Sequence, residues 1–112
     1  MVTPTIGAIV LVPFPFSDLS YSMLRPAAVL ADAGKADWVL CQITSRSYAD
    51  LHVIEIEDTD FVSGSLKLTS YIRPGKLFTA SSSLMVSQVG VLKKEKVEQI
   101  VNAVVNLLQA GL

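Results

Sequence analysis

The sequence predicts a small antiparallel β barrel followed by one C-terminal helix, and three observations support this fold class. The chain has 112 residues, which is enough for one domain, residues 1–112, around a single hydrophobic core. Short apolar runs separated by turn residues follow each other closely, as in small barrels. After Leu92 the apolar residues change to helical spacing.

The first three strands are predicted where short apolar runs are bounded by proline, glycine or polar residues. The run "GAIVLVPF" lies between Gly7 and Pro13 and is typical of a buried strand. The run "PAAVLADA" follows, and Gly34 marks a turn after it. The third run, "DWVLCQIT", is again mostly apolar and is expected to be buried.

The later strands are predicted to be shorter. "LHVIEIE" alternates in polarity, which predicts a strand with one wetter face. "DTDFVSGS" is expected to be a loop because of its Asp, Ser and Gly content. "LKLTSYIRP" is expected to end at Pro74, and "GKLF" and "MVSQVGVL" are predicted as further strands. We therefore expect five to seven strands in total.

The C-terminal helix is predicted from Lys93 to Gln109, before Gly111. Its apolar stripe consists of Val97, Ile100, Val101, Val104, Leu107 and Leu108. Val105 and Leu112 lie outside this stripe, so the apolar face is wide. Either the strands of the same chain cover the whole face, or a dimer partner covers part of it.

Composition limits the functions that the chain can have. The net charge of −1 and the pI of about 5.7 argue against coating of nucleic acid through bulk charge, but they allow a local basic groove. A single cysteine, Cys41, excludes an internal disulfide and fits a reducing compartment. The apolar run of residues 6–16 is too short to span a membrane and is not built like a signal peptide, so we expect a cytoplasmic protein.

Four segments, in this order, resemble the PemK/MazF-like family of bacterial toxins: "GAIVLVPFPFSDLSYSMLRPAAVL", "VLCQITS", "SYIRPGKLF" and "QVGVLKKEKVEQI". The resemblance covers residues 7–108. It implies an SH3-like barrel of the CcdB/PemK/MazF type with a C-terminal helix. It also implies a homodimeric toxin of a type II toxin–antitoxin system. Such a toxin inhibits growth by cleaving single-stranded RNA, including mRNA, without a metal or other cofactor, and a cognate antitoxin protein inhibits it.

Arg25 and Thr44 are the predicted catalytic residues. Metal-free RNA cleavage uses the 2′-hydroxyl of the RNA, so the protein must move protons and place positive charge near the phosphate. The guanidinium of Arg25 suits phosphate oxygens, and Pro26 biases Arg25 toward an extended backbone. Alternatively, Arg25 forms a structural ion pair with Asp18 or closes the barrel end. Thr44 matches a functional threonine of the family; the alternative is a strand-end threonine that bonds to the backbone.

A second group of residues is predicted to bind RNA. The segment before Arg25 can fold over the RNA, with Phe16 or Tyr21 stacking on a base. His52 is the only side chain expected to titrate near neutrality, and it is either a proton donor or base contact or simply a surface residue. The predicted RNA contacts are Phe16, Ser17, Tyr21, Ser45, Arg46, His52, Arg73 and Lys76.

The sequence departs from the family pattern at three positions. Gly75 and Ala8 stand where acidic residues are usual, and Tyr21 stands where a small residue is expected. These departures favour an alternative function, a catalytically weakened or inactive family member that acts as a binding module. A CcdB-like toxin directed at gyrase is a further alternative, although the last residues, "LLQAGL", lack the aromatic contacts of those toxins. A peptide-docking barrel ranks last, because no dense aromatic groove is encoded.

Overall fold

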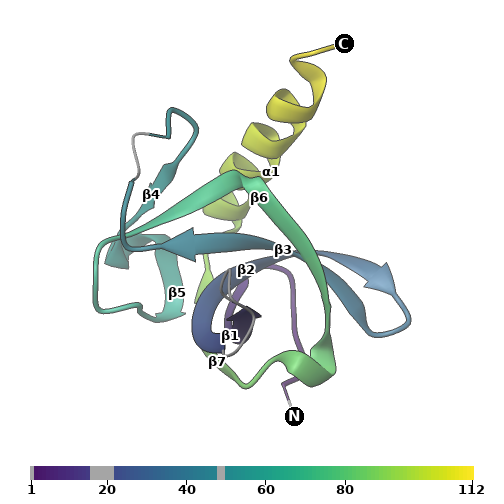
Figure 1. Ribbon diagram of the computed structural model, residues 1–112. Helices are drawn as coiled ribbons and strands as arrows, with labels where there is room; N and C mark the ends of the chain where they lie inside the picture. The colour runs from purple at the N-terminus through teal and green to yellow at the C-terminus, as the bar shows by residue number, and fades with distance from the viewer. Residues whose placement is uncertain (1, 16–21, 48–49) are drawn as a thin grey trace.

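The computed structural model describes residues 2–15, 22–47 and 50–112 and shows a strongly bent antiparallel sheet with one C-terminal helix (Figure 1). The elements are β1 (Ala8–Pro15), β2 (Ser22–Gly34), β3 (Asp37–Thr44), β4 (Ile54–Ile56), η1 (Asp58–Asp60), β5 (Phe61–Gly64), β6 (Ser70–Ser81), η2 (Ser82–Leu84), β7 (Ser87–Leu92) and α1 (Lys94–Gln109).

The seven strands lie in the order β4-β6-β3-β2-β1-β7-β5. Within the described residues, the edge strands β4 and β5 do not pair with each other, so the sheet is a half-barrel with two edges. Register shifts occur in four of the strand pairs, and such bulges increase the coiling of a sheet. The predicted fold class, mainly β with a C-terminal helix, is confirmed.

Several of the element predictions were wrong, and one is that residues 66–69, predicted to begin a strand, lie before β6, which starts at Ser70. The segment predicted as a loop, residues 58–65, contains η1 and the edge strand β5, which pairs with β7. Only Phe61 of β5 is buried, so this strand has no alternation for a sequence pattern to detect. β6 also continues past Pro74, because Pro74 lies in the irregular stretch between the pairs Ile43–Ile72 and Cys41–Leu77. A proline is tolerated there, where no ladder hydrogen bond is lost.

The core consists of two clusters on opposite faces of the bent sheet. β1 contributes to both, with Ile9 in one cluster and Ala8 and Val10 in the other. This two-sided burial explains why the first strands have continuous apolar runs. The cluster that contains Ile9 also receives Ile100 of α1, which is fully buried.

Helix α1 begins within one residue of its predicted start and ends at the predicted Gln109. Its first turn is attached to η1, because Lys96 Nζ lies 3.3 Å from Asp60 Oδ2 and the Lys93 N–H donates to the Asp60 carbonyl at 2.8 Å. The C-terminal half of α1 extends beyond the sheet (Figure 1). In the part of the chain that the structure describes, no helix is both long and apolar enough to cross a membrane.

Candidate functional site

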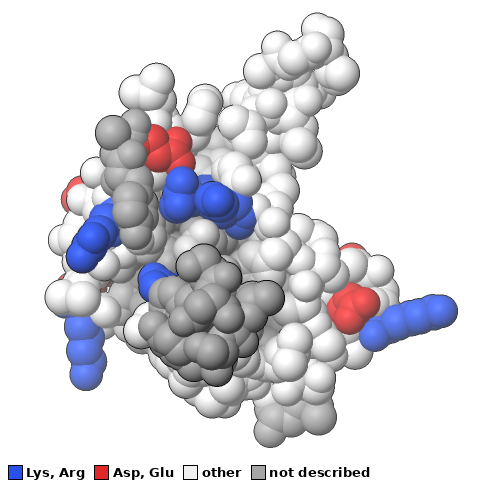
Figure 2. Space-filling view, in the orientation of Figure 1, with Lys and Arg blue, Asp and Glu red and all other residues white. Residues whose placement is uncertain are grey.

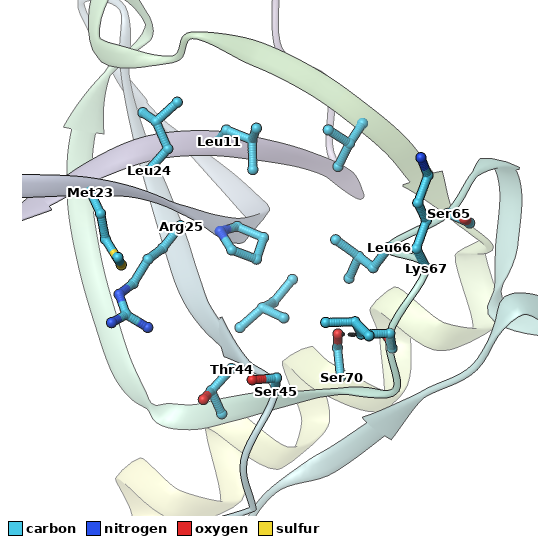
Figure 3. A pocket seen from close by; sticks show the side chains of 14 residues that line it. Leu11, Met23, Leu24, Arg25, Thr44, Ser45, Ser65, Leu66, Lys67 and Ser70 are labelled. Atoms are coloured by element: carbon cyan, nitrogen blue, oxygen red, sulfur yellow. Dashed lines mark hydrogen bonds between the residues drawn. The ribbon is translucent and has the colours of Figure 1, made fainter.

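A pocket of about 400 Å³ lies between the β1–β2–β3 part of the sheet and residues 65–70 (Figure 3). Apolar side chains form most of its wall, and polar groups are few. The lining residues are Leu11, Met23, Leu24, Arg25, Pro26, Ile43, Thr44, Ser45, Ser65, Leu66, Lys67, Leu68, Ser70 and Val89. Three of the predicted site residues, Arg25, Thr44 and Ser45, therefore meet in one pocket.

Arg25 lies on β2 opposite Val12 of β1 and is partly buried. The strands on both sides of β2 fix its backbone, as the sequence predicts from the extended Arg25–Pro26 pair. Figure 3 shows its guanidinium at the same end of the pocket as the Thr44 hydroxyl, while Leu66 and Lys67 lie at the opposite end. This end of the pocket combines a fixed positive charge with a hydroxyl, which suits an anionic group.

Thr44 is the last residue of β3 and is only 5% exposed. Its Oγ1 accepts a hydrogen bond from the Arg46 N–H at 3.2 Å, which is the backbone bond expected of a strand-end threonine. This bond uses a lone pair of the oxygen and leaves the hydroxyl proton for another acceptor. The backbone contact and a ligand contact are therefore compatible.

The remaining predicted RNA contacts lie outside the pocket lining. Arg46 and His52 are exposed on the segment between β3 and β4, and Lys76 is exposed on β6. Arg73 is partly buried on β6, in the irregular stretch that follows Ile72. Phe16, Ser17 and Tyr21, and the proposed ion-pair partner Asp18, lie outside the described residues.

Asp50 connects β6 with the segment between β3 and β4, and the sequence did not indicate it as a site residue. Its Oδ2 lies 3.4 Å from Arg73 Nε, and its Oδ1 accepts the His52 N–H at 2.8 Å. The His52 N–H, with a smaller contribution from Arg73, holds the pKa of the Asp50 carboxyl below its usual value. Since Asp50 and Arg73 are far apart in the sequence, no local pattern could have indicated this contact.

The positions that depart from the family pattern have clear environments. Ala8 is fully buried in the core, so an acidic side chain would not fit there without rearrangement. Gly75 is exposed, and a Cβ there would meet only Leu107 Cδ2 at 3.6 Å, an ordinary contact distance. A carboxylate at position 75 is thus sterically acceptable, and its absence is a feature of this chain.

The fold disfavours the thiolate form of Cys41, which is the reactive form of a cysteine. Burial raises the pKa of its thiol to about 12, and Sγ donates to the Arg73 carbonyl at 3.0 Å. Among residues 2–15, 22–47 and 50–112, no three His, Cys, Asp or Glu side chains come together as metal ligands.

Positive charge is concentrated locally although the net charge is −1. In Figure 2, Lys and Arg side chains gather on one part of the face that is shown, with a small acidic group at their margin. This uneven distribution leaves part of the face locally basic in spite of the net charge.

The bent sheet, the helix and the pocket lined by Arg25 and Thr44 define a small half-barrel protein with a cationic side chain at one end of its pocket. The family model of PemK-like, MazF-like toxins of type II toxin–antitoxin systems matches residues 5–108, and the chain belongs to this family.

Several solved structures have the same fold. MazE–MazF from Deinococcus radiodurans has a TM-score of 0.75 at 18% identity and covers 96% of this chain and 97% of that one. An endoribonuclease in complex with its cognate antitoxin, from a mycobacterial species, gives 0.72 at 17% identity, with 95% of each chain covered. Mycobacterium tuberculosis toxin MazF-mt6 gives 0.69 at 15% identity, covering 90% of this chain and 95% of that one. No curated protein matches the sequence significantly.

Proposed function

We propose that this toxin is a metal-independent endoribonuclease that cleaves single-stranded RNA, including mRNA, and so inhibits growth. The observation that carries the proposal is the meeting of Arg25 and Thr44 at one end of the pocket. Family membership and the structural likeness to endoribonucleases support it.

The reaction begins when the RNA 2′-oxygen attacks the adjacent phosphorus. The 2′-O–P bond forms and the P–O5′ bond breaks, which leaves a 2′,3′-cyclic phosphate and a 5′-hydroxyl. The 2′-hydroxyl loses its proton, and the 5′-oxygen gains one. Arg25 stabilises the negative charge that grows on the phosphate oxygens, and Thr44 donates its remaining proton to one of them.

A second candidate function is that of a weakly active or inactive binding module. The observation that favours it is that the described lining of the pocket contains no His, Asp or Glu to accept the 2′-hydroxyl proton. Either a group outside this lining accepts the proton of the 2′-hydroxyl, or RNA cleavage is slow. The RNA test below separates the two functions.

The proposed partners are RNA, a cognate antitoxin and a second copy of the chain, all in the cytoplasm. Two of the similar structures are toxin–antitoxin complexes, which supports an antitoxin partner here. The antitoxin is proposed to act by covering the end of the pocket that contains Arg25.

The RNA test uses the purified chain, a long single-stranded RNA and excess EDTA. We expect fragments that carry a 5′-hydroxyl, and we expect much slower cleavage of the same RNA annealed to its complement. Growth arrest on induced expression should accompany RNA cleavage. If the wild type neither cuts RNA nor slows growth, but Gly75→Asp does both, the second candidate function is correct.

The homodimer is proposed to form through the exposed side of α1. Val101, Val105 and Leu108 are 37%, 41% and 64% exposed, and they form a stripe along one side of α1. A two-fold axis can bring two such stripes together. Leu108→Glu is therefore expected to shift the protein from about 24 kDa to the 12.1 kDa of one chain in sedimentation at micromolar concentration. Asn106→Glu, also exposed on α1, is the matched control; a monomeric wild type would contradict the proposal.

A further inference from the structure

The lining of the pocket includes two buried side chains that carry hydroxyl groups. Among the described residues, the buried polar side chains are Thr44 and Ser70, each 5% exposed, and both line the pocket. They lie on neighbouring strands, since Thr44 pairs with Tyr71, the residue after Ser70. Buried hydroxyls must form hydrogen bonds, and the bond that each one already makes determines what it can still offer to a ligand.

The two hydroxyls have opposite hydrogen-bonding capacity left: one can donate to a ligand and the other can accept from it. Ser70 Oγ donates its proton to the Leu68 carbonyl at 3.0 Å (dashed line in Figure 3), because a carbonyl oxygen can only accept. Ser70 therefore has only lone pairs left for a ligand. Thr44 Oγ1 already accepts from the Arg46 N–H and has its proton left. A ligand that extends from the strand end into this pocket can reach a donor at Thr44 and an acceptor at Ser70.

The wall between these groups is apolar. Leu11, Ile43, Leu66 and Val89 face the interior, and no aromatic side chain belongs to the described lining. The volume of about 400 Å³ lies within the range of small-molecule sites, about 300 to 1,000 Å³. A flat apolar group can lie between these side chains. The pocket can then distinguish one such ligand from another only through hydrogen bonds to the polar groups at the edge of the ligand.

We propose that the pocket holds one nucleobase next to the scissile phosphate, and that Ser70 accepts a hydrogen bond from an exocyclic amino group of that base. The proposal rests on the endoribonuclease function and adds a specificity-determining residue to it. The phosphate lies at Arg25 and Thr44, and the base points toward Ser70. Adenine, cytosine and guanine carry such an amino group, whereas uracil presents a carbonyl that the Ser70 lone pairs repel.

The test uses short RNAs around a mapped cleavage site. Each nucleotide beside the cut is replaced by its analogue without the amino group: inosine for guanosine, purine riboside for adenosine, or 2-pyrimidinone riboside for cytidine. At one of these positions, loss of the amino group should slow wild-type cleavage roughly 10- to 100-fold, because the buried Ser70 acceptor is left unsatisfied.

Ser70→Ala should remove this preference and cleave the paired substrates at nearly equal rates. Ser70→Thr keeps the hydroxyl and should restore the preference, which a purely structural role of Ser70 would not require. Ser83→Ala, an exposed serine of η2 outside the pocket lining, is the matched control and should behave as the wild type. Melting temperatures of all variants check that the fold is retained.

Two results would overturn the inference while the endoribonuclease function stands: an unchanged wild-type rate for every analogue, or full base preference in Ser70→Ala. If the wild type cuts no RNA, the endoribonuclease function fails separately. Binding of the same RNAs with a 2′-deoxy nucleotide at the cut is then measured instead. Equal affinity for amino-bearing and amino-lacking RNAs would overturn the base pocket as well.

Discussion

Arg25→Ala is expected to lower the rate of RNA cleavage about 100- to 1,000-fold, the usual effect of removing one preorganised donor from a developing anion. Arg25 is held between paired strands, at the pocket end that also contains the Thr44 hydroxyl. Its backbone is thus in place before the reaction begins, and the guanidinium starts from a fixed strand position. The measurement is single-turnover cleavage of one RNA by purified wild type and variant.

Two further variants separate the geometry of Arg25 from its charge. Arg25→Lys should also lose most of the activity, because an ammonium group cannot bind two phosphate oxygens as the planar guanidinium does. Arg46→Ala is the matched control: it removes the same charge from an exposed residue that does not line the pocket, and its loss should be much smaller. Equal rates for the wild type and Arg25→Ala would show that Arg25 has no catalytic role.

The strands and the helix were predictable wherever burial left a continuous or periodic apolar pattern. β3 and the end of α1 have their predicted bounds, since β3 is largely buried and α1 keeps apolar residues at helical spacing around the buried Ile100 and Val104. β5 was not predictable, because only Phe61 of that edge strand is buried. The continuity of β6 through Pro74 depends on a register shift against β3, and that shift is a property of the assembled sheet.

The sequence could indicate Arg25 and Thr44 as candidate site residues, because each has a side chain suited to phosphate and each matches a family motif. Both line the pocket. Ser70 and Leu66 were missed because residues 66–69 read as part of a strand, whereas they form a pocket wall between β5 and β6. The contact between Asp50 and Arg73 likewise depends on the fold. For cations such as Arg46 and Lys76, the sequence alone does not show whether the side chain lines a binding site or lies on the ordinary surface.

Asp50 provides a carboxylate in a chain that lacks the two acidic residues usual in the family pattern. The usual acidic positions are occupied by Ala8, which is buried in the core, and by Gly75, which is exposed. Asp50 places a carboxylate beside Arg73 from a different segment, and the hydrogen bond from the His52 N–H, with a smaller contribution from Arg73, lowers the pKa of this carboxyl. The chain therefore has a carboxylate beside Arg73, although acidic residues are absent from positions 8 and 75.

The second large effect is expected for Gly64→Ala, which should reduce the free energy of unfolding by about 3 kcal/mol. Gly64 has a φ of +74°, which disfavours L side chains, and an added Cβ would lie 2.6 Å from Gly90 Cα and would also overlap the Val89 carbonyl oxygen. These are backbone atoms of β7, so neither can move without shifting the β5–β7 pair. Urea denaturation followed by circular dichroism measures the loss.

Gly34→Ala is the matched control for this substitution. Gly34 has a similar φ of +91°, but an added Cβ there would meet no atom within 4 Å. Gly34→Ala should therefore reduce the free energy of unfolding by only about 1 kcal/mol, the cost of a left-handed backbone at an alanine. Equal losses at the two positions would mean that β7 relaxes without cost. Because residues 65–70 begin directly after Gly64 and form the pocket wall, Gly64→Ala should also weaken the base preference that Ser70 provides, whereas Gly34→Ala should leave it intact.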